Sequence, residues 1–145
     1  MSTTTTGRPS ASFGLLILRV VVGAIFVAHG AQKVFEFTIP GTVQAFAGMG
    51  APLPEVVGPF IAFLELIGGL LLVVGLLTRP VALLLAVDMV GAIVLVHLPA
   101  GLWVSNGGYE FVALLGGASL ALVFTGAGAF AIDRVVLRGP VRALA

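Results

Sequence analysis

Four long apolar runs constrain this chain more than any other feature of its sequence. Each approaches the ~20 apolar residues that a helix needs to cross the hydrocarbon core of a bilayer. The mean hydropathy is +1.21 and only 9% of the residues are charged, so a water-soluble fold could not cover this much apolar surface. The runs are Phe13 to His29, Val56 to Leu77, Pro80 to Leu98 and Tyr109 to Ala127. Because backbone groups in lipid must be hydrogen-bonded within each span, the sequence predicts an all-α integral membrane protein, a bundle of four transmembrane helices.

The polar ends of the chain frame this membrane domain. We expect residues 1–12, which include MSTTTTGRPS, to form a disordered tail. Residues 13–134 should form the membrane domain, and residues 135–145 a basic tail. Lys and Arg concentrate on the cytoplasmic side of membrane proteins. One side of the predicted spans holds Arg8, Arg79, Arg134, Arg138 and Arg142, and the other holds only Lys33. We therefore expect both termini to be cytoplasmic.

A weak internal repeat relates the two halves of the chain. The segment VGAIFVAH at residues 22–29 matches VGAIVLVH at residues 90–97, and LIGGLLLVV at 66–74 is similar to LLGGASLAL at 114–122. Duplication of one helical hairpin would explain this pattern, and so would chance similarity between apolar helices. If the hairpin is duplicated, a site is expected at the repeat interface.

Ionisable side chains inside the apolar runs are the strongest functional signal. A charge within hydrocarbon costs roughly 2.5–3.5 kcal/mol, so it must be paired or bind something. At about 1.5 Å per residue, Arg19 lies about 9 Å inside its span and Asp88 about 12 Å beyond the start of its own, with Glu65 near the midplane. These residues predict a buried network in which Arg19 forks between the two carboxylates. The network would be a structural lock, or its excess negative charge would make Glu65 a proton relay.

A second group of ionisable residues is expected near the outer surface. It contains His29, Lys33, Glu36, His97 and Glu110. His29 and His97 match in the repeat and could ligate a haem axially, but we favour half-hydrated positions in the headgroup region for both. His97 lies nine residues beyond Asp88, on roughly the opposite helical face, so the two are not expected to point into one bundle centre.

Other polar features have structural interpretations or exclude functions. Glu110 suits the positive end of the fourth helix, and Trp103 suits the aromatic belt at the membrane surface. The chain has no cysteine, which excludes membrane oxidoreductases that exchange disulfides. We find no spacing of metal ligands and no basic cluster for nucleic acid. A redox role would therefore depend on a bound cofactor, a quinone or a partner.

The polar and glycine residues follow a recognisable order along the chain. The first span and its sequel read LLILRVVVGAIFVAHGAQKVFEF, with Arg19, Gly23, Phe26, His29, Gly30 and Lys33. The second span supplies Glu65, Gly68, Gly69, Gly75, Thr78 and Arg79, and the close supplies Thr125, Gly126, Gly128 and Asp133. Jointly these motifs resemble the DoxX family over nearly the whole chain, from Phe13 to Arg134. Asp88 is not part of the pattern.

The resemblance implies a small multi-pass protein of the bacterial cytoplasmic (inner) membrane. It also implies a relation to the membrane subunit of thiosulfate:quinone oxidoreductase, and a link to redox and oxidative-stress assemblies. On that basis the expected function is a redox-complex subunit that binds quinone or quinol. Glu65, His29 and Arg19 are the catalytic candidates. Candidates for binding the quinone are His29, Lys33, His97, Glu110 and Trp103.

Two other functions stay open at this stage. The protein could be a non-catalytic membrane anchor for soluble redox proteins, with its charges acting only in packing. It could also be a small proton-coupled transporter. The expected partners are the lipid bilayer and soluble redox proteins, and the sequence does not distinguish a monomer from a homo-oligomer or identify the electron donor.

Overall fold

The computed structural model describes residues 9–136, and all regular structure in that range is helical. The prediction of an all-α protein is therefore confirmed. The α-helices are α1 (Pro9–Ala31), α2 (Thr38–Gly48), α3 (Pro54–Val74), α4 (Thr78–Ala92), α5 (Glu110–Thr125) and α6 (Asp133–Val136). Two π-helical turns, Gln32–Glu36 and Ile93–His97, extend α1 and α4, and short 3₁₀ turns cover Leu98–Ala100 and Val104–Asn106.

Three helical segments in the described range are long and apolar enough to cross a membrane. They are Ser10–Glu36, Pro54–Val74 and Thr78–Ala100. Helix α5 is apolar but has only 16 residues, which is slightly short of the usual range of about 17–25. The fourth span therefore stays a prediction.

The ends of the chain are only partly described. Helix α1 begins at Pro9, where the fixed φ of proline suits the first helical turn, so the prediction of disorder is wrong for residues 9–12. Residues 1–8, which include Arg8, and residues 137–145, which include Arg138 and Arg142, lie outside the described residues.

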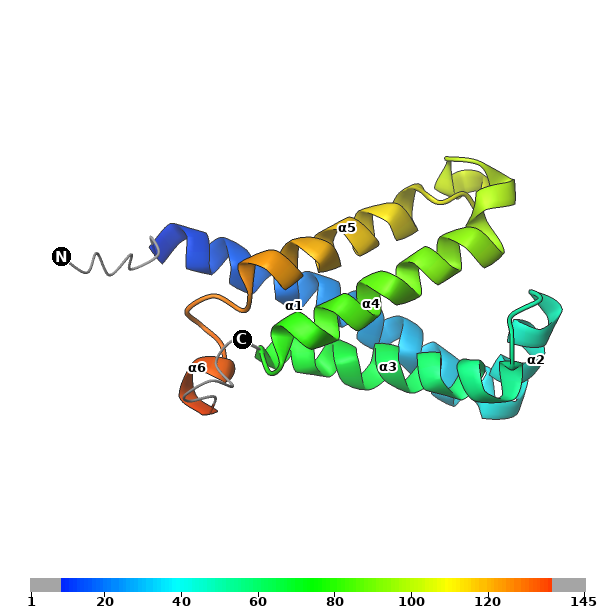
Figure 1. Ribbon diagram of the computed structural model, residues 1–145, viewed down its shortest axis with the longest axis horizontal. Coiled ribbons are helices and arrows are strands. Elements are labelled where there is room, and N and C mark those ends of the chain that lie inside the picture. The colour runs from blue at the N-terminus through cyan, green and yellow to red at the C-terminus, as the bar shows by residue number, and fades with distance from the viewer. Residues whose placement is uncertain (1–8, 137–145) are drawn as a thin grey trace.

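The helices form two closely packed pairs, α1 with α3 and α4 with α5, and α3 makes a smaller contact with α4 (Figure 1). Glycines allow the first pair to approach closely. A Cβ atom added to Gly23 would lie 2.6 Å from the carbonyl oxygen of Gly69, and one added to Gly69 would lie 2.6 Å from that of Gly23. Small residues allow this packing in lipid, where the hydrophobic effect does not drive helix association. The buried core includes Phe26, Leu72 and Leu85.

The side chain of Arg19 lies where α3 ends, beside the segment that leads to α6. It is buried and donates to the carbonyl oxygens of Leu72 at 3.1 Å and Val73 at 2.7 Å, and to that of Phe130. The last carbonyls of a helix have no intrahelical partner and attract a cation. Arg19 therefore caps α3, and the prediction that it forks between Glu65 and Asp88 is wrong.

Gly75 and Asp133 complete the arrangement around Arg19. Gly75 has a φ of +72°, and a Cβ atom there would lie 2.5 Å from Nη1 of Arg19. The buried carboxylate of Asp133 accepts hydrogen bonds from the backbone amides of Leu77 at 2.7 Å and Thr78 at 3.1 Å. Asp133 thus acts as an N-cap for α4 although it is distant in sequence. Arg19, Gly75 and Asp133, with these backbone partners, are called the inner lock below.

Candidate functional site

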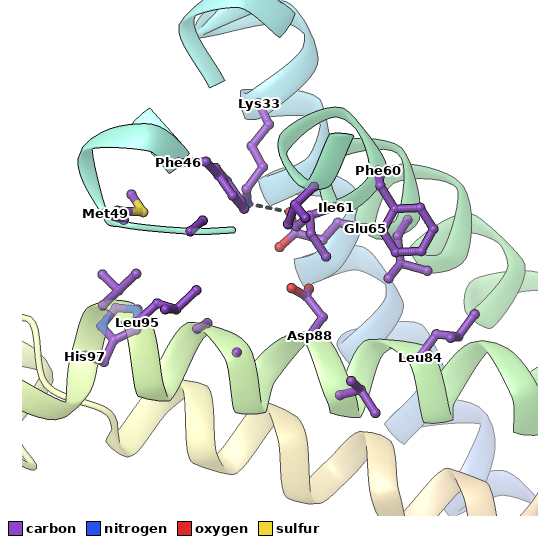
Figure 2. A pocket seen from close by; sticks show the side chains of 17 residues that line it. Lys33, Phe46, Met49, Phe60, Ile61, Glu65, Leu84, Asp88, Leu95 and His97 are labelled. Carbon is purple, nitrogen blue, oxygen red and sulfur yellow. Dashed lines mark hydrogen bonds and ion pairs between the residues drawn. The ribbon is translucent and has the colours of Figure 1, made fainter. Parts of the chain in front are cut away.

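A cavity of about 350 Å³ lies between α2, α3 and α4, at the end of the bundle opposite the inner lock (Figure 2). Most of its wall is apolar and comes from the three helices and the segment after α2. Its polar residues are Lys33, Glu65, Asp88 and His97. This combination of an apolar wall with a few convergent polar groups is typical of sites for small ligands.

The central interaction of the cavity is an ion pair between Lys33 and Glu65. The Lys33 Nζ atom donates to Oε2 of Glu65 at 2.5 Å, and the side chains are 21% and 4% exposed. Lys33 belongs to the π-helical turn after α1, whereas Glu65 lies in the middle of α3. From the sequence we expected Lys33 near the outer surface, but its long side chain extends to Glu65 in the cavity (Figure 2).

A hydrogen bond to α2 holds the Lys33 backbone in place. In the π-helical turn the amide of Phe37 donates to the carbonyl of Gln32 rather than to that of Lys33. The Lys33 carbonyl instead accepts a hydrogen bond from the buried hydroxyl of Thr42, with an Oγ1 to O distance of 2.9 Å. Helix α2 is therefore tied to the segment that carries the cation of the cavity.

The second π-helical turn brings His97 to the same cavity as Asp88. Each side chain in a π turn advances by a smaller angle than in an α turn, because the hydrogen bonds join residues five apart. The prediction that Asp88 and His97 cannot share a centre is therefore wrong, since it assumed α-helical geometry through residues 93–97. The His97 Nδ1 atom lies 2.7 Å from the carbonyl oxygen of Gly107, with which it hydrogen-bonds.

Asp88 is the least satisfied polar residue of the cavity. Its carboxyl group points across the cavity toward Glu65 (Figure 2), close enough to both Glu65 and Lys33 for direct electrostatic interaction. Within the described part of the chain, three buried side-chain atoms lack a hydrogen-bond partner: Arg19 Nε, Thr78 Oγ1 and Asp88 Oδ2. Of these residues, Asp88 lines the cavity. It therefore offers a free acceptor to a ligand.

Several residues predicted for the site lie elsewhere. His29 is exposed on α1, with its ring edge-on to Phe111 at 6.3 Å between centroids. Glu110 accepts a hydrogen bond from the backbone amide of Val104 at 2.7 Å, and Trp103 is 62% exposed. None of these lines the cavity, so the structure does not bring them together with Lys33 and Glu65. His29 and His97 also have different partners.

Sequence reasoning missed the contribution of the region around α2. Phe46, Met49 and Ala51 form part of the cavity wall. The signal available was the long apolar segment between the first two spans, which indicates an interfacial helix but not the side it covers. Among residues 9–136 no group of three or more His, Asp or Glu side chains is placed to hold a metal ion.

Comparison with known proteins gives related sequences but no related structure. A family model described as DoxX matches residues 14–98, which contain all four polar residues of the cavity. The chain is 41% identical to "Putative oxidoreductase CatD" of Bacillus subtilis, over 90% of this chain and 92% of the relative. It is 37% identical to an uncharacterized protein of Haemophilus influenzae (82% and 87% covered) and 34% identical to "Inner membrane protein YphA" of Escherichia coli (83% and 88%). No solved structure gives a significant match.

Proposed function

The chain belongs to the DoxX family and is a multi-pass protein of the bacterial inner membrane. From this premise we propose that it is the membrane subunit of a redox complex. In this proposal its cavity binds the head of a quinone or quinol. One observation carries the proposal: a partly buried ammonium–carboxylate pair and a free carboxylate oxygen face a cavity whose remaining wall is apolar. The name of the Bacillus relative, an oxidoreductase, supports the same class of activity.

The polar groups of the cavity complement both forms of a quinone. The carbonyl oxygens of the oxidised form accept hydrogen bonds, and the Lys33 ammonium is a donor. The hydroxyl groups of the reduced form donate, and the free Oδ2 atom of Asp88 is an acceptor. Each form therefore finds a partner at the same end of the cavity.

Interconversion of the two forms requires protons and electrons. Quinone takes up two electrons and two protons to become quinol, and the reverse step releases them. In this proposal Asp88 and Glu65 exchange the protons with the ligand oxygens. His97, at the outer end of the cavity, passes them toward the aqueous surface. The electrons come from, or go to, a soluble redox protein bound to the membrane subunit, since the chain has no cysteine of its own to carry them.

The proposal includes a topology with four spans and cytoplasmic termini. Helix α5 packs along α4, which together with the turns that follow it forms the span Thr78–Ala100. A helix slightly shorter than the bilayer is accommodated by local thinning. The start of α1 and α6 lie at one end of the bundle (Figure 1). Arg79, which follows α3, and Arg134 in α6 place positive charge at that end.

Binding of quinone by the purified protein tests the function. We expect quinone to co-purify in mild detergent and to bind saturably after reconstitution into nanodiscs. Glu65→Gln should weaken this binding while the protein stays folded and retains its protein partners. Glu55→Gln, on the exposed first turn of the same helix, is the matched control and should bind as the native protein does.

Two outcomes would decide against a quinone site. Absence of both co-purified quinone and saturable binding would reject it. If Glu65→Gln instead released the protein partners, and activity fell only in proportion to this loss of assembly, the protein would be a scaffold rather than a quinone-binding subunit.

A further inference from the structure

A second, apolar groove continues from the cavity along α3 and α4. Its volume is about 430 Å³. It shares Phe60, Leu64 and Leu84 with the cavity, and Figure 2 shows Phe60 and Leu84 at the end away from His97. The rest of its lining is Pro59, Phe63, Ile67, Gly68, Leu71 and Val81. The groove and the cavity therefore adjoin across the three shared side chains, with the polar groups on the side of the cavity.

The shape of the groove suits a long chain rather than a compact group. Along α3 it extends from Pro59 to Leu71, about 18 Å of helix at ~1.5 Å per residue. Ile67 is 52% exposed, and in a membrane this surface faces hydrocarbon. Gly68 contributes no side chain, and a Cβ atom there would already lie 3.3 Å from Cγ1 of Val81.

We propose that this groove holds the prenyl tail of the quinone whose head occupies the cavity, and that the ligand is therefore a long-tailed, membrane-dissolved quinone that enters laterally from the bilayer. This inference rests on the proposed function and adds the ligand class to it. The wall that the groove shares with the polar cavity supports it, because one molecule with a polar head and an apolar tail would occupy both when the shared side chains move aside.

The charges of the cavity argue against a phospholipid as the occupant. Lys33 supplies one cationic group, whereas Glu65 and Asp88 supply two carboxyl groups, so an anionic phosphate would meet a site that is not basic. Glu65 also lies eleven residues into α3, about 16 Å from its first residue, where a lipid headgroup would leave the interface. A neutral quinone ring carries no such cost.

Paired variants and paired ligands test the tail site. The probes are menadione, which has no tail, and menaquinone with several prenyl units, both measured in nanodiscs and expressed as mole fraction in the bilayer so that partitioning cancels. The native protein should bind the tailed ligand more tightly. Ile67→Trp should fill the groove and weaken menaquinone binding about threefold or more, with menadione binding unchanged.

Matched controls separate a blocked groove from a disturbed protein. Ile17→Trp on α1 alters an isoleucine that is 51% exposed and should leave both affinities at native values. Gly68→Leu is a second blocking variant. Its control is Gly117→Leu on α5, where an added Cβ atom has no neighbour within 4 Å.

The outcomes distinguish this inference from the function on which it rests. Equal affinity for both probes in the native protein, or equal losses in Ile67→Trp and Ile17→Trp, would overturn the tail site while leaving the head site. Failure of the native protein to bind either probe would reject the quinone function itself. A phospholipid retained by the native protein and lost from Ile67→Trp would assign the groove to an acyl chain and overturn the inference.

Discussion

The inner lock and the cavity both bury charged side chains, but they use them differently. At the inner lock, Arg19 donates to three backbone carbonyls and Asp133 accepts from two backbone amides. In the cavity, Lys33 and Glu65 bind each other and Asp88 keeps a buried oxygen without a partner. The first arrangement joins segments of the chain, whereas the second leaves bonding capacity directed at open space.

This difference gives a way to interpret ionisable residues in lipid. The cost of a buried charge is offset in both places, so burial alone does not indicate function. Among the described residues, Arg19 also keeps one buried donor, Nε, without a partner. This side chain lines neither the cavity nor the groove along α3 and α4, so its hydrogen bonds to helix ends have a structural role. A charge that faces a cavity with an unsatisfied neighbour is a candidate for binding or proton transfer.

The largest expected effect is at the inner lock. Arg19→Ala removes the donor from the carbonyls of Val73 and Phe130 and leaves that of Leu72 with the Gly75 amide. It should lower the free energy of unfolding by about 3–5 kcal/mol, since each unsatisfied buried acceptor costs about 1–3 kcal/mol. Unfolding by denaturing detergent measures this loss. Arg134→Ala, at an exposed position, is the control and should change stability by less than about 0.5 kcal/mol. Native stability for Arg19→Ala would remove the basis for calling this region a lock.

The next effect separates stability from ligand binding in the cavity. Lys33→Met leaves the Glu65 carboxylate buried without its cation and should cost about 2 kcal/mol, less than for a fully buried pair because Lys33 is 21% exposed. The double variant Lys33→Met with Glu65→Leu should regain most of that stability. Quinone binding should be lost in both proteins. Recovery of binding together with stability would show that the pair acts only in packing.

Asp88→Asn should affect binding and not folding. The substitution removes the charge of an acceptor that has no partner on Oδ2, so the free energy of unfolding should stay the same or rise slightly. Quinol affinity should fall at least about tenfold, because a hydrogen bond to a charged group contributes about 1.5–3 kcal/mol. Equilibrium binding in nanodiscs measures it. If the free energy of unfolding fell by more than the free energy of quinol binding, Asp88 would belong with the structural residues.

The smallest effect concerns the two histidines. His97 lines the cavity and His29 does not, although the repeat makes them equivalent in sequence. His97→Ala should reduce proton-coupled turnover of quinone several-fold, whereas His29→Ala should stay within about twofold of the native rate, its loss being that of one ring contact. Turnover with a reconstituted redox partner measures both. A larger effect for His29 would reverse the assignment of the cavity as the site.

Sequence reasoning succeeded where a single physical rule decides the outcome. Hydropathy and the need to satisfy backbone hydrogen bonds predict the apolar helices, and helix depth predicts that Glu65 is buried. It failed for Arg19 because depth does not reveal whether a guanidinium meets a carboxylate or a helix end. It failed for the pairing of Asp88 with His97 because the π-helical turn at residues 93–97 changes the angular position of every later side chain.

The hydrogen bond between Thr42 and the Lys33 carbonyl has a mechanical consequence. Helix α2 contributes Phe46 to the wall of the cavity, and Lys33 supplies its cation, so this bond joins a wall element to the ion pair. A displacement of α2 away from α3 would therefore either break this hydrogen bond or move the Lys33 backbone. The wall of the cavity and the position of its cation thus depend on one hydroxyl group.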